Sequence, residues 1–229
     1  MYTLHIANKN YSSWSLRPWV LMRSLGIPFS EILHPFEPGS NRERFRGFSP
    51  NGKVPSLVDT STTIWDSLAI TEYLAERHAG VWPEDPMARA WARCAAAEMH
   101  SGFAALRECC SMNCGVRVRL DEVPAPLLLD IERVQELWKD GLARFGGPFL
   151  AGPEFTAADA FFAPVAFRVQ TYGLVLDAAA GAYAARLLAL EAMVDWYAEA
   201  LREPWRDEAH DAETRRAGTW LEDLRASAG

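Results

Sequence analysis

The sequence predicts an α+β protein in which a small domain with a mixed sheet is followed by an all-α domain. Strand and helix patterns alternate over residues 1–77, whereas residues 88–206 show helical periodicity. Residues 78–87, between the two parts, contain two prolines and one glycine and are typical of a linker. A chain of 229 residues is long enough for two domains of this size.

The first domain is predicted to contain strands and helices in alternation. In chain order, these elements are residues 2–7, 13–25, 29–34, 41–48, 56–58, 63–65 and 67–77. Gly26 and Pro28 end the first helix, because glycine favours the left-handed residue after a helix and proline cannot continue one. The turn-prone residues 59–61 join the last two strands as a hairpin. This βαβαββα order is the thioredoxin-like arrangement, with a sheet that is parallel at its start and antiparallel at its end.

The all-α domain is predicted to consist mainly of long helices. They span residues 88–113, 125–145, 157–171 and 183–201. Thr156 and Asp159 have the spacing of a capping box, in which each side chain bonds the backbone N–H of the other, so their expected role is structural. Residues 207–229 are expected to form a C-terminal extension that docks on the helices through a weak apolar stripe around Trp220.

Composition excludes several classes of function. The net charge of −7 and the lack of a Lys/Arg block argue against nucleic-acid binding. No apolar run reaches the roughly 18 residues of a membrane span, and no secretory signal is visible, so we expect a cytoplasmic protein. Metal-ligand spacing is absent among the cysteines, so we expect them to be reduced and no metal to be bound. The cysteines are Cys94, Cys109, Cys110 and Cys114.

The hairpin and the helix after it carry the strongest indication of a binding site. Asp66 and Ser67 lie at the start of that helix, where free backbone N–H groups and the helix dipole favour a carboxylate. Val54 precedes Pro55 just before the hairpin, and a cis bond there leaves the Val54 N–H and C=O free to pair with an extended peptide. Together these features indicate a site for a small zwitterionic peptide.

A serine cluster occupies the position where thioredoxin-like proteins carry a redox Cys-x-x-Cys motif. It comprises Ser12, Ser13 and Ser15 around Trp14. Serine cannot form a mixed disulfide, so dithiol exchange lacks its nucleophile here. A hydroxyl hydrogen bond stabilises a thiolate, which is the attacking form of a thiol. The alternative role for each serine is helix N-capping.

These features together resemble the glutathione S-transferase superfamily. The pattern Ser-Ser-x-Ser-x-Arg over residues 12–17 is similar to the serine motif of theta-type and especially zeta-type members. The resemblance implies that glutathione is the co-substrate and that one of the serines, Ser12 first, faces its sulfur. Zeta enzymes usually carry a cysteine where Trp14 stands, which weakens the transfer of their isomerase activity to this chain.

The resemblance also implies how glutathione is held. The Val54 backbone, positioned by cis-Pro55, would pair with its cysteinyl residue. Asp66 and Ser67 would bind the amine and carboxylate of its γ-glutamyl end, although most relatives have Glu or Gln where Asp66 stands. Lys53 would reach its glycyl carboxylate.

The electrophile is expected to bind between the serine loop and the first long helix. The candidate residues for this pocket are Met99, His100, Phe103 and Arg107 on that helix, and Arg168. Arg168 stands near the position at which zeta enzymes place an arginine for a substrate carboxylate.

The function implied is a detoxification-type glutathione transferase that adds the thiolate to an electrophilic small molecule and forms a homodimer across the first long helices. One alternative is a glutathione-dependent cis–trans isomerase of the maleylacetoacetate type. Another is a non-catalytic ligand-binding module with the same fold.

Overall fold

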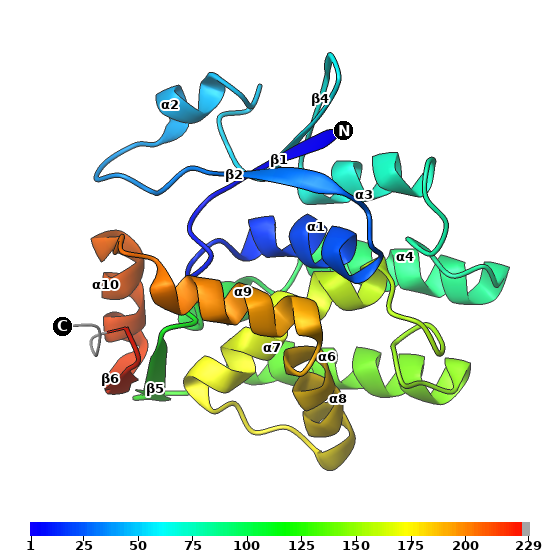
Figure 1. Cartoon of the computed structure of the whole chain (residues 1–229). Helices are drawn as coiled ribbons and strands as arrows, with labels where there is room; N and C mark the ends of the chain where they lie inside the picture. Colours follow the sequence, from blue (N-terminus) through cyan, green and yellow to red (C-terminus); the bar gives the residue numbers. More distant parts are fainter. Residues whose placement is uncertain (226–229) are drawn as a thin grey trace.

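The computed structural model describes residues 1–225, so the last four residues of the predicted C-terminal extension lie outside the described part. The N-terminal half contains a four-stranded sheet and the C-terminal half is mainly helical, which confirms the predicted fold class. Figure 1 shows the sheet on one side of the molecule and the C-terminal helices on the other, with α1 (Ser13–Ser24) between them.

The sheet has the predicted mixed topology. Its strands are β1 (Tyr2–Ile6), β2 (Phe29–Leu33), β3 (Ser56–Asp59) and β4 (Thr62–Trp65), in the spatial order β2-β1-β3-β4. β1 is parallel to β2 and antiparallel to β3, and β3 and β4 form the hairpin. Leu4 pairs with Leu57 across β1 and β3, and both are fully buried beneath the sheet. Two helices complete this half, α2 (Arg42–Arg46) and α3 (Ser67–Ala75).

The C-terminal half is built around one buried helix, α7. Its helices are α4 (Pro86–Ser101), α5 (Ala104–Cys109), α6 (Ala125–Phe145), α7 (Ala157–Tyr172), α8 (Ala178–Leu188), α9 (Glu191–Arg202) and α10 (Glu208–Ala217). α7 packs against α1 of the first half and against α4 and α8 of its own half. Because α7 is apolar on nearly all sides, it forms the core that joins the two halves.

Two of the predicted long helices are each divided in the structure. The helix expected over residues 88–113 ends at Ser101, and Phe103 adopts a left-handed conformation with φ of +60° before α5 begins. The helix expected over residues 183–201 is divided between α8 and α9, since Leu190 has the extended backbone of an N-cap. Neither break contains a proline, and the apolar periodicity continues through both. The sequence therefore predicted one continuous helix in each case.

The C-terminal half was predicted to be purely helical, but it also contains a two-stranded antiparallel sheet. β5 (Val116–Leu120) pairs with β6 (Gly218–Asp223), which follows α10 directly. Val116 and Val118 point into the core while the residues between them are more exposed, which is the period-two alternation of a half-buried strand. The C-terminal extension therefore lies against the helical half through strand pairing, and Trp220 also packs against the hydrophobic core. Leu221 and Leu224 are exposed.

The start of α7 is fixed by a buried carboxylate. The capping box between Thr156 and Asp159 is present, and the Asp159 side chain is fully buried. Asp159 accepts hydrogen bonds from the backbone N–H groups of Thr156 and Leu150, each at 2.9 Å, and from the Tyr183 hydroxyl at 2.7 Å. This carboxylate therefore holds the preceding loop and α8 as well as its own helix.

Within residues 1–225 no helix is both long and apolar enough to cross a membrane. The four cysteines are free.

We predict that Asp159→Ala lowers the free energy of unfolding by about 3 kcal/mol or more, because several buried donors lose their acceptor together. The matched control is Asp177→Ala at the exposed N-cap of α8, where Asp177 accepts the Ala180 N–H at 2.9 Å. That control is expected to cost about 1 kcal/mol. Urea unfolding of both variants measures the difference, and equal losses would contradict the role assigned to Asp159.

Candidate functional site

The site begins at the loop between β1 and α1, which is buried although it is polar. Asn8, Lys9, Asn10, Tyr11 and Ser12 are each no more than 6% exposed. Burial of polar groups is unfavourable unless each finds a hydrogen-bond partner. The partners of this loop come mostly from the C-terminal half of the chain.

Lys9 and Asn10 show how this anchoring works. The Lys9 carbonyl accepts the Trp196 indole N–H at 2.8 Å, and the Lys9 ammonium group pairs with Glu31 at 2.7 Å and also with Glu199. The Asn10 side chain donates to Asn113 Oδ1 at 2.7 Å and accepts the Gly115 N–H at 2.7 Å. The loop that precedes the serines is therefore fixed by both halves of the protein.

Tyr11 is anchored by the C-terminal segment. Its hydroxyl donates to Asp211 Oδ1 at 3.0 Å and accepts from Arg225 at 3.0 Å. Burial, reinforced by the Asp211 carboxylate, raises the pKa of the Tyr11 phenol to about 12. Tyr11 is therefore a neutral structural donor, and its hydroxyl is committed to these partners.

The three predicted serines occupy different positions. Ser12 and Ser13 line a pocket at the N-terminus of α1, whereas Ser15 is fully buried behind them. The Ser12 hydroxyl makes no helix-capping bond and instead donates to Ser15 Oγ at 2.7 Å, and Ser15 Oγ also accepts the Ala7 N–H at 3.3 Å. Ser15 thus orients Ser12 from within the core.

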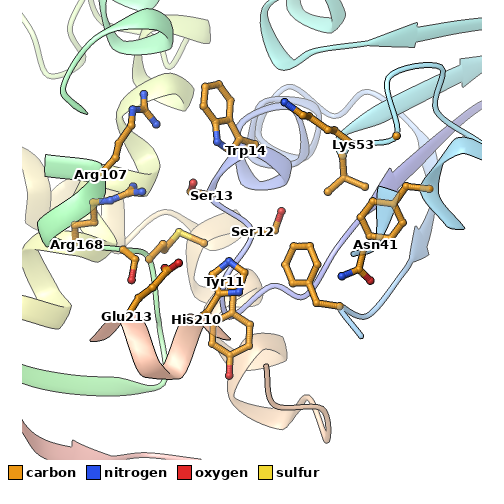
Figure 2. Close-up of a pocket in the computed structure, with 16 residues that line it drawn as sticks. Tyr11, Ser12, Ser13, Trp14, Asn41, Lys53, Arg107, Arg168, His210 and Glu213 are labelled. Atoms are coloured by element: carbon orange, nitrogen blue, oxygen red, sulfur yellow. The ribbon is translucent and has the colours of Figure 1, made fainter. Parts of the chain in front are cut away.

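The pocket lies between the two halves of the molecule and has a volume of about 400 Å³. From the N-terminal half it is lined by Tyr11, Ser12, Ser13, Trp14, Phe36, Asn41, Phe45, Gly52, Lys53 and Val54. From the C-terminal half it is lined by Arg107, Ser111, Met112, Arg168, His210 and Glu213. Figure 2 shows the arginines on one side of Ser12 and Ser13, and Lys53 with Asn41 on the opposite side.

Two of the predicted glutathione-binding residues, Lys53 and Val54, line this pocket. The Val54–Pro55 peptide bond is cis, as expected from the sequence, and Pro55 is buried just before β3. The Lys53 side chain is exposed at the rim.

Two further predicted glutathione-binding residues, Asp66 and Ser67, stand at the start of α3 and outside the residues that line the pocket. Asp66 is the N-cap of α3, with φ of +76°, and its Oδ1 accepts the Leu68 N–H at 2.8 Å. Its other oxygen lies 3.5 Å from His100 Nε2. Ser67 is buried, and its hydroxyl lies 3.4 Å from Arg17 Nη1.

Trp14 connects these two parts of the site. It lines the pocket, and its ring packs edge-on against His100 at 5.3 Å and under the Arg17 guanidinium at 4.1 Å. His100 and Arg17 are the side chains that contact Asp66 and Ser67. The indole therefore contacts both the pocket and the side chains that meet the start of α3.

Three arginines concentrate positive charge behind and along the pocket. Arg17 and Arg168 are at most 4% exposed, and Arg107 is partly buried beside them. Within residues 1–225 their hydrogen bonds go to backbone carbonyl oxygens and to Ser67, and none goes to a carboxylate. Burial, followed by repulsion among these charges, lowers the pKa of Arg17 and lowers that of Arg168 to about 10. Uncompensated buried charge of this kind favours an anionic ligand.

Three predicted members of the electrophile pocket lie elsewhere. Met99 and Phe103 are buried in the core, and His100 faces Asp66 rather than the pocket. The predicted common face assumed one continuous helix, and the break at Gly102 rotates Phe103 out of register. Burial lowers the pKa of His100, although Asp66 opposes this effect.

Two pocket residues from α10, His210 and Glu213, were not predicted from the sequence. A usable signal was present, since Asp207 and His210 have the spacing of an N-cap and its third helical residue. Nothing in the sequence showed that this segment returns to the serine loop. Within the described part of the chain, no group of three or more His, Cys, Asp or Glu side chains is placed to hold a metal ion.

Comparisons with known proteins agree with the fold. Residues 11–77 match the family model of the glutathione S-transferase N-terminal domain. The chain is 29% identical over 165 residues to glutathione S-transferase-like protein OpS6 of Beauveria bassiana. The aligned region covers 64% of this chain and 72% of that protein.

Two solved structures have the same fold. A glutathione transferase homologue from Burkholderia, crystallised with bound glutathione, has a TM-score of 0.63 and 22% identity over 87% of this chain and 97% of its own. A maleylacetoacetate isomerase from Methylobacterium extorquens, crystallised with malonate and glutathione, has a TM-score of 0.62 and 23% identity, over 88% of this chain and 98% of its own.

We predict that Asp211→Ala lowers the free energy of unfolding by about 2–3 kcal/mol, since the Tyr11 hydroxyl and the Asn113 amide lose a buried acceptor. Limited proteolysis should then cut first within residues 203–225. The matched control is Glu222→Ala, an exposed site on the same segment, with an expected change within about 0.5 kcal/mol. An Asp211 variant as stable and as resistant as the control would show that this anchor is dispensable.

Proposed function

Because the chain belongs to the glutathione S-transferase superfamily, we propose that it is a glutathione transferase that stabilises the thiolate of glutathione through Ser12 and adds it to an electrophilic small molecule. The observation that carries this proposal is the Ser12 hydroxyl, which lines the pocket at the N-terminus of α1 without capping that helix. A hydroxyl left out of the capping role is available to a ligand.

The expected shift in thiol pKa follows from known magnitudes. A free thiol with a pKa of about 8.5 is only a few per cent ionised at pH 7. A hydrogen bond to a charged acceptor contributes about 1.5–3 kcal/mol, equivalent to roughly one to two pKa units. The helix N-terminus adds about 0.3–1 kcal/mol for an anion. On binding, the Ser12 hydroxyl would rotate from Ser15 towards the sulfur, and the Ser15 hydroxyl would then donate to Ser12.

The remaining glutathione contacts would extend from this pocket to the start of α3. The Val54 backbone would pair with the cysteinyl residue beside the serines, and Lys53 at the rim would meet the glycyl carboxylate. Asp66 keeps one carboxylate oxygen for the γ-glutamyl amine, because its other oxygen already caps α3. Ser67, with Arg17 behind it, would bind the γ-glutamyl carboxylate, and Trp14 would lie along this end of the tripeptide.

We predict that Ser12→Ala raises the thiol pKa of bound glutathione by about one to two units and lowers kcat about 10- to 100-fold, while the affinity for glutathione changes little. Thiolate absorbance in the ultraviolet, titrated against pH, measures the shift. Ser24→Ala at the exposed C-terminal end of the same helix is the matched control.

The outcomes of this titration separate the transferase from a non-catalytic module. Glutathione that binds with an unshifted thiol pKa in the parent protein would favour a module that carries the ligand without activating it. A thiol pKa that is lowered in the parent protein and returns towards the value of free glutathione in the Ser12→Ala variant would support the transferase.

A second candidate function is supported by the arginines. Arg107 and Arg168 line the pocket beyond the serines, and within residues 1–225 neither is hydrogen-bonded to a carboxylate. Such a surface suits an electrophile that carries a carboxylate, as a maleyl-type diacid does. The Methylobacterium isomerase was crystallised with the diacid malonate as well as glutathione. Glutathione-dependent cis–trans isomerisation of such a diacid is therefore the alternative to conjugation.

We predict that Arg168→Gln raises KM for an anionic electrophile by about 10-fold or more relative to a neutral electrophile, because a charge-assisted hydrogen bond is worth about 1.5–3 kcal/mol. The ratio of the two KM values is the measurement, since a general folding defect would affect both substrates alike. Arg133→Gln on the exposed face of α6 is the control. An unchanged ratio would remove the diacid isomerase from consideration.

A further inference from the structure

Ionisation of a thiol releases a proton, and most of the pocket cannot accept it. The hydroxyls of Ser12 and Ser13 are donors to the thiolate, and Lys53, Arg107 and Arg168 carry protons already. A useful acceptor has a pKa near the working pH, which among side chains is the property of histidine. Within the described residues, His210 is the one histidine that lines this pocket.

His210 is held in place by a carboxylate. It lies in the first turn of α10, and its Nδ1 contacts Oδ2 of Asp207, the N-cap of that helix. Asp207 Oδ2 also accepts the His210 backbone N–H at 3.3 Å. A carboxylate on Nδ1 fixes the tautomer that leaves Nε2 as the proton acceptor, and it stabilises the imidazolium that forms when Nε2 takes a proton.

Two aromatic rings fix the plane of the His210 imidazole. Tyr11 and Phe36 stack on it, each with a centroid distance of 5.1 Å and an interplanar angle of 24°. Tyr11 immediately precedes Ser12, so the ring stands beside the serine loop, as Figure 2 shows. Within residues 1–225 the hydrogen bonds of the His210 side chain go to Asp207 alone, which leaves Nε2 available to a ligand.

We propose that His210 is the general base of this site and that Asp207 is its positioning residue. In this step the S–H bond of glutathione breaks, its proton passes to His210 Nε2, and the electron pair stays on the sulfur beside Ser12. The thiolate then forms the S–C bond to the electrophile, and the imidazolium returns the proton to the anion or leaving group that results. This inference rests on the proposed transferase function.

The charged groups around the imidazole are consistent with this role. Asp207 faces it from its own helix, and Glu213 lies one turn further along α10. From the opposite side the ring meets Tyr11, whose hydroxyl is committed to Asp211. Lys53 lines the same pocket from the loop before β3. The contact between Asp207 and His210 also serves as a helix cap, so the test must separate capping from catalysis.

His210→Gln is expected to lower kcat about a hundredfold while the Kd for glutathione stays within about twofold, because general-base catalysis contributes typically 10²–10⁴-fold. Asp207→Asn keeps a good N-cap and removes the charge, so it should lower kcat without lowering the thermal stability of the protein. Glu208→Gln, at an exposed position of α10 outside the pocket lining, is the matched control, with kcat expected to change less than threefold.

Recovery of kcat by an added small base distinguishes a catalytic role of His210 from a structural one, because a free base cannot replace a structural contact. His210→Ala leaves a slot between two aromatic rings, and added imidazole should restore a large part of the lost kcat. A His210→Gln variant with parental kcat, or a His210→Ala variant whose lost activity imidazole does not restore, would overturn the inference.

Two outcomes distinguish a failure of the proposed transferase function from a failure of the general-base inference. If the parent protein does not bind glutathione, both the transferase function and the general-base role of His210 are rejected. If Ser12→Ala loses activity and His210→Gln does not, the transferase stands and the base alone is rejected.

Discussion

The site depends on the burial of one polar loop, residues 8–12, between the two halves of the protein. Nothing in this loop is apolar except part of Tyr11, so its burial is tolerable only because most of its polar groups find partners. The exception among its side chains is the Asn8 amide nitrogen, which has no partner within residues 1–225. Those partners come from α9, from the segment before β5 and from α10. The position of Ser12 is therefore determined by contacts from the C-terminal half, although the serine itself lies in the N-terminal half.

Electrostatics place a second constraint on the same region. Arg17 is buried against Trp14 and Phe161, whose ring faces offset part of the cost of removing its charge from water. Arg107 and Arg168 add like charges that lower the pKa of Arg17, and the Asp66 carboxylate opposes this effect. A tripeptide with two carboxylates, together with an acidic electrophile, would supply the missing negative charge. Binding of anions would thus stabilise the fold and form the reactive complex at once.

Local patterns predicted most of the N-terminal domain. The strand alternation, the stop at Gly26, the hairpin and the serine cluster are all encoded within a few residues of where they act, and the structure places each element within about two residues of its expected position. The C-terminal half was harder, because its departures from the prediction are set by distant contacts. The pairing of β5 with β6 joins segments about a hundred residues apart. At the break after α4 the left-handed residue is Phe103 and not the preceding Gly102, which local sequence does not predict.

The same distinction explains which site residues were found. Ser12, Lys53 and Val54 belong to short motifs that can be read alone, and they share one pocket. His210 and Glu213 carry no motif, and only the folded chain brings α10 to the serine loop. Because the strand that follows α10 is paired with β5, the position of His210 is fixed from both ends of its helix, by Asp211 on Tyr11 and by β6 on β5. The C-terminal segment is therefore a wall of the site, to which it contributes His210 and Glu213.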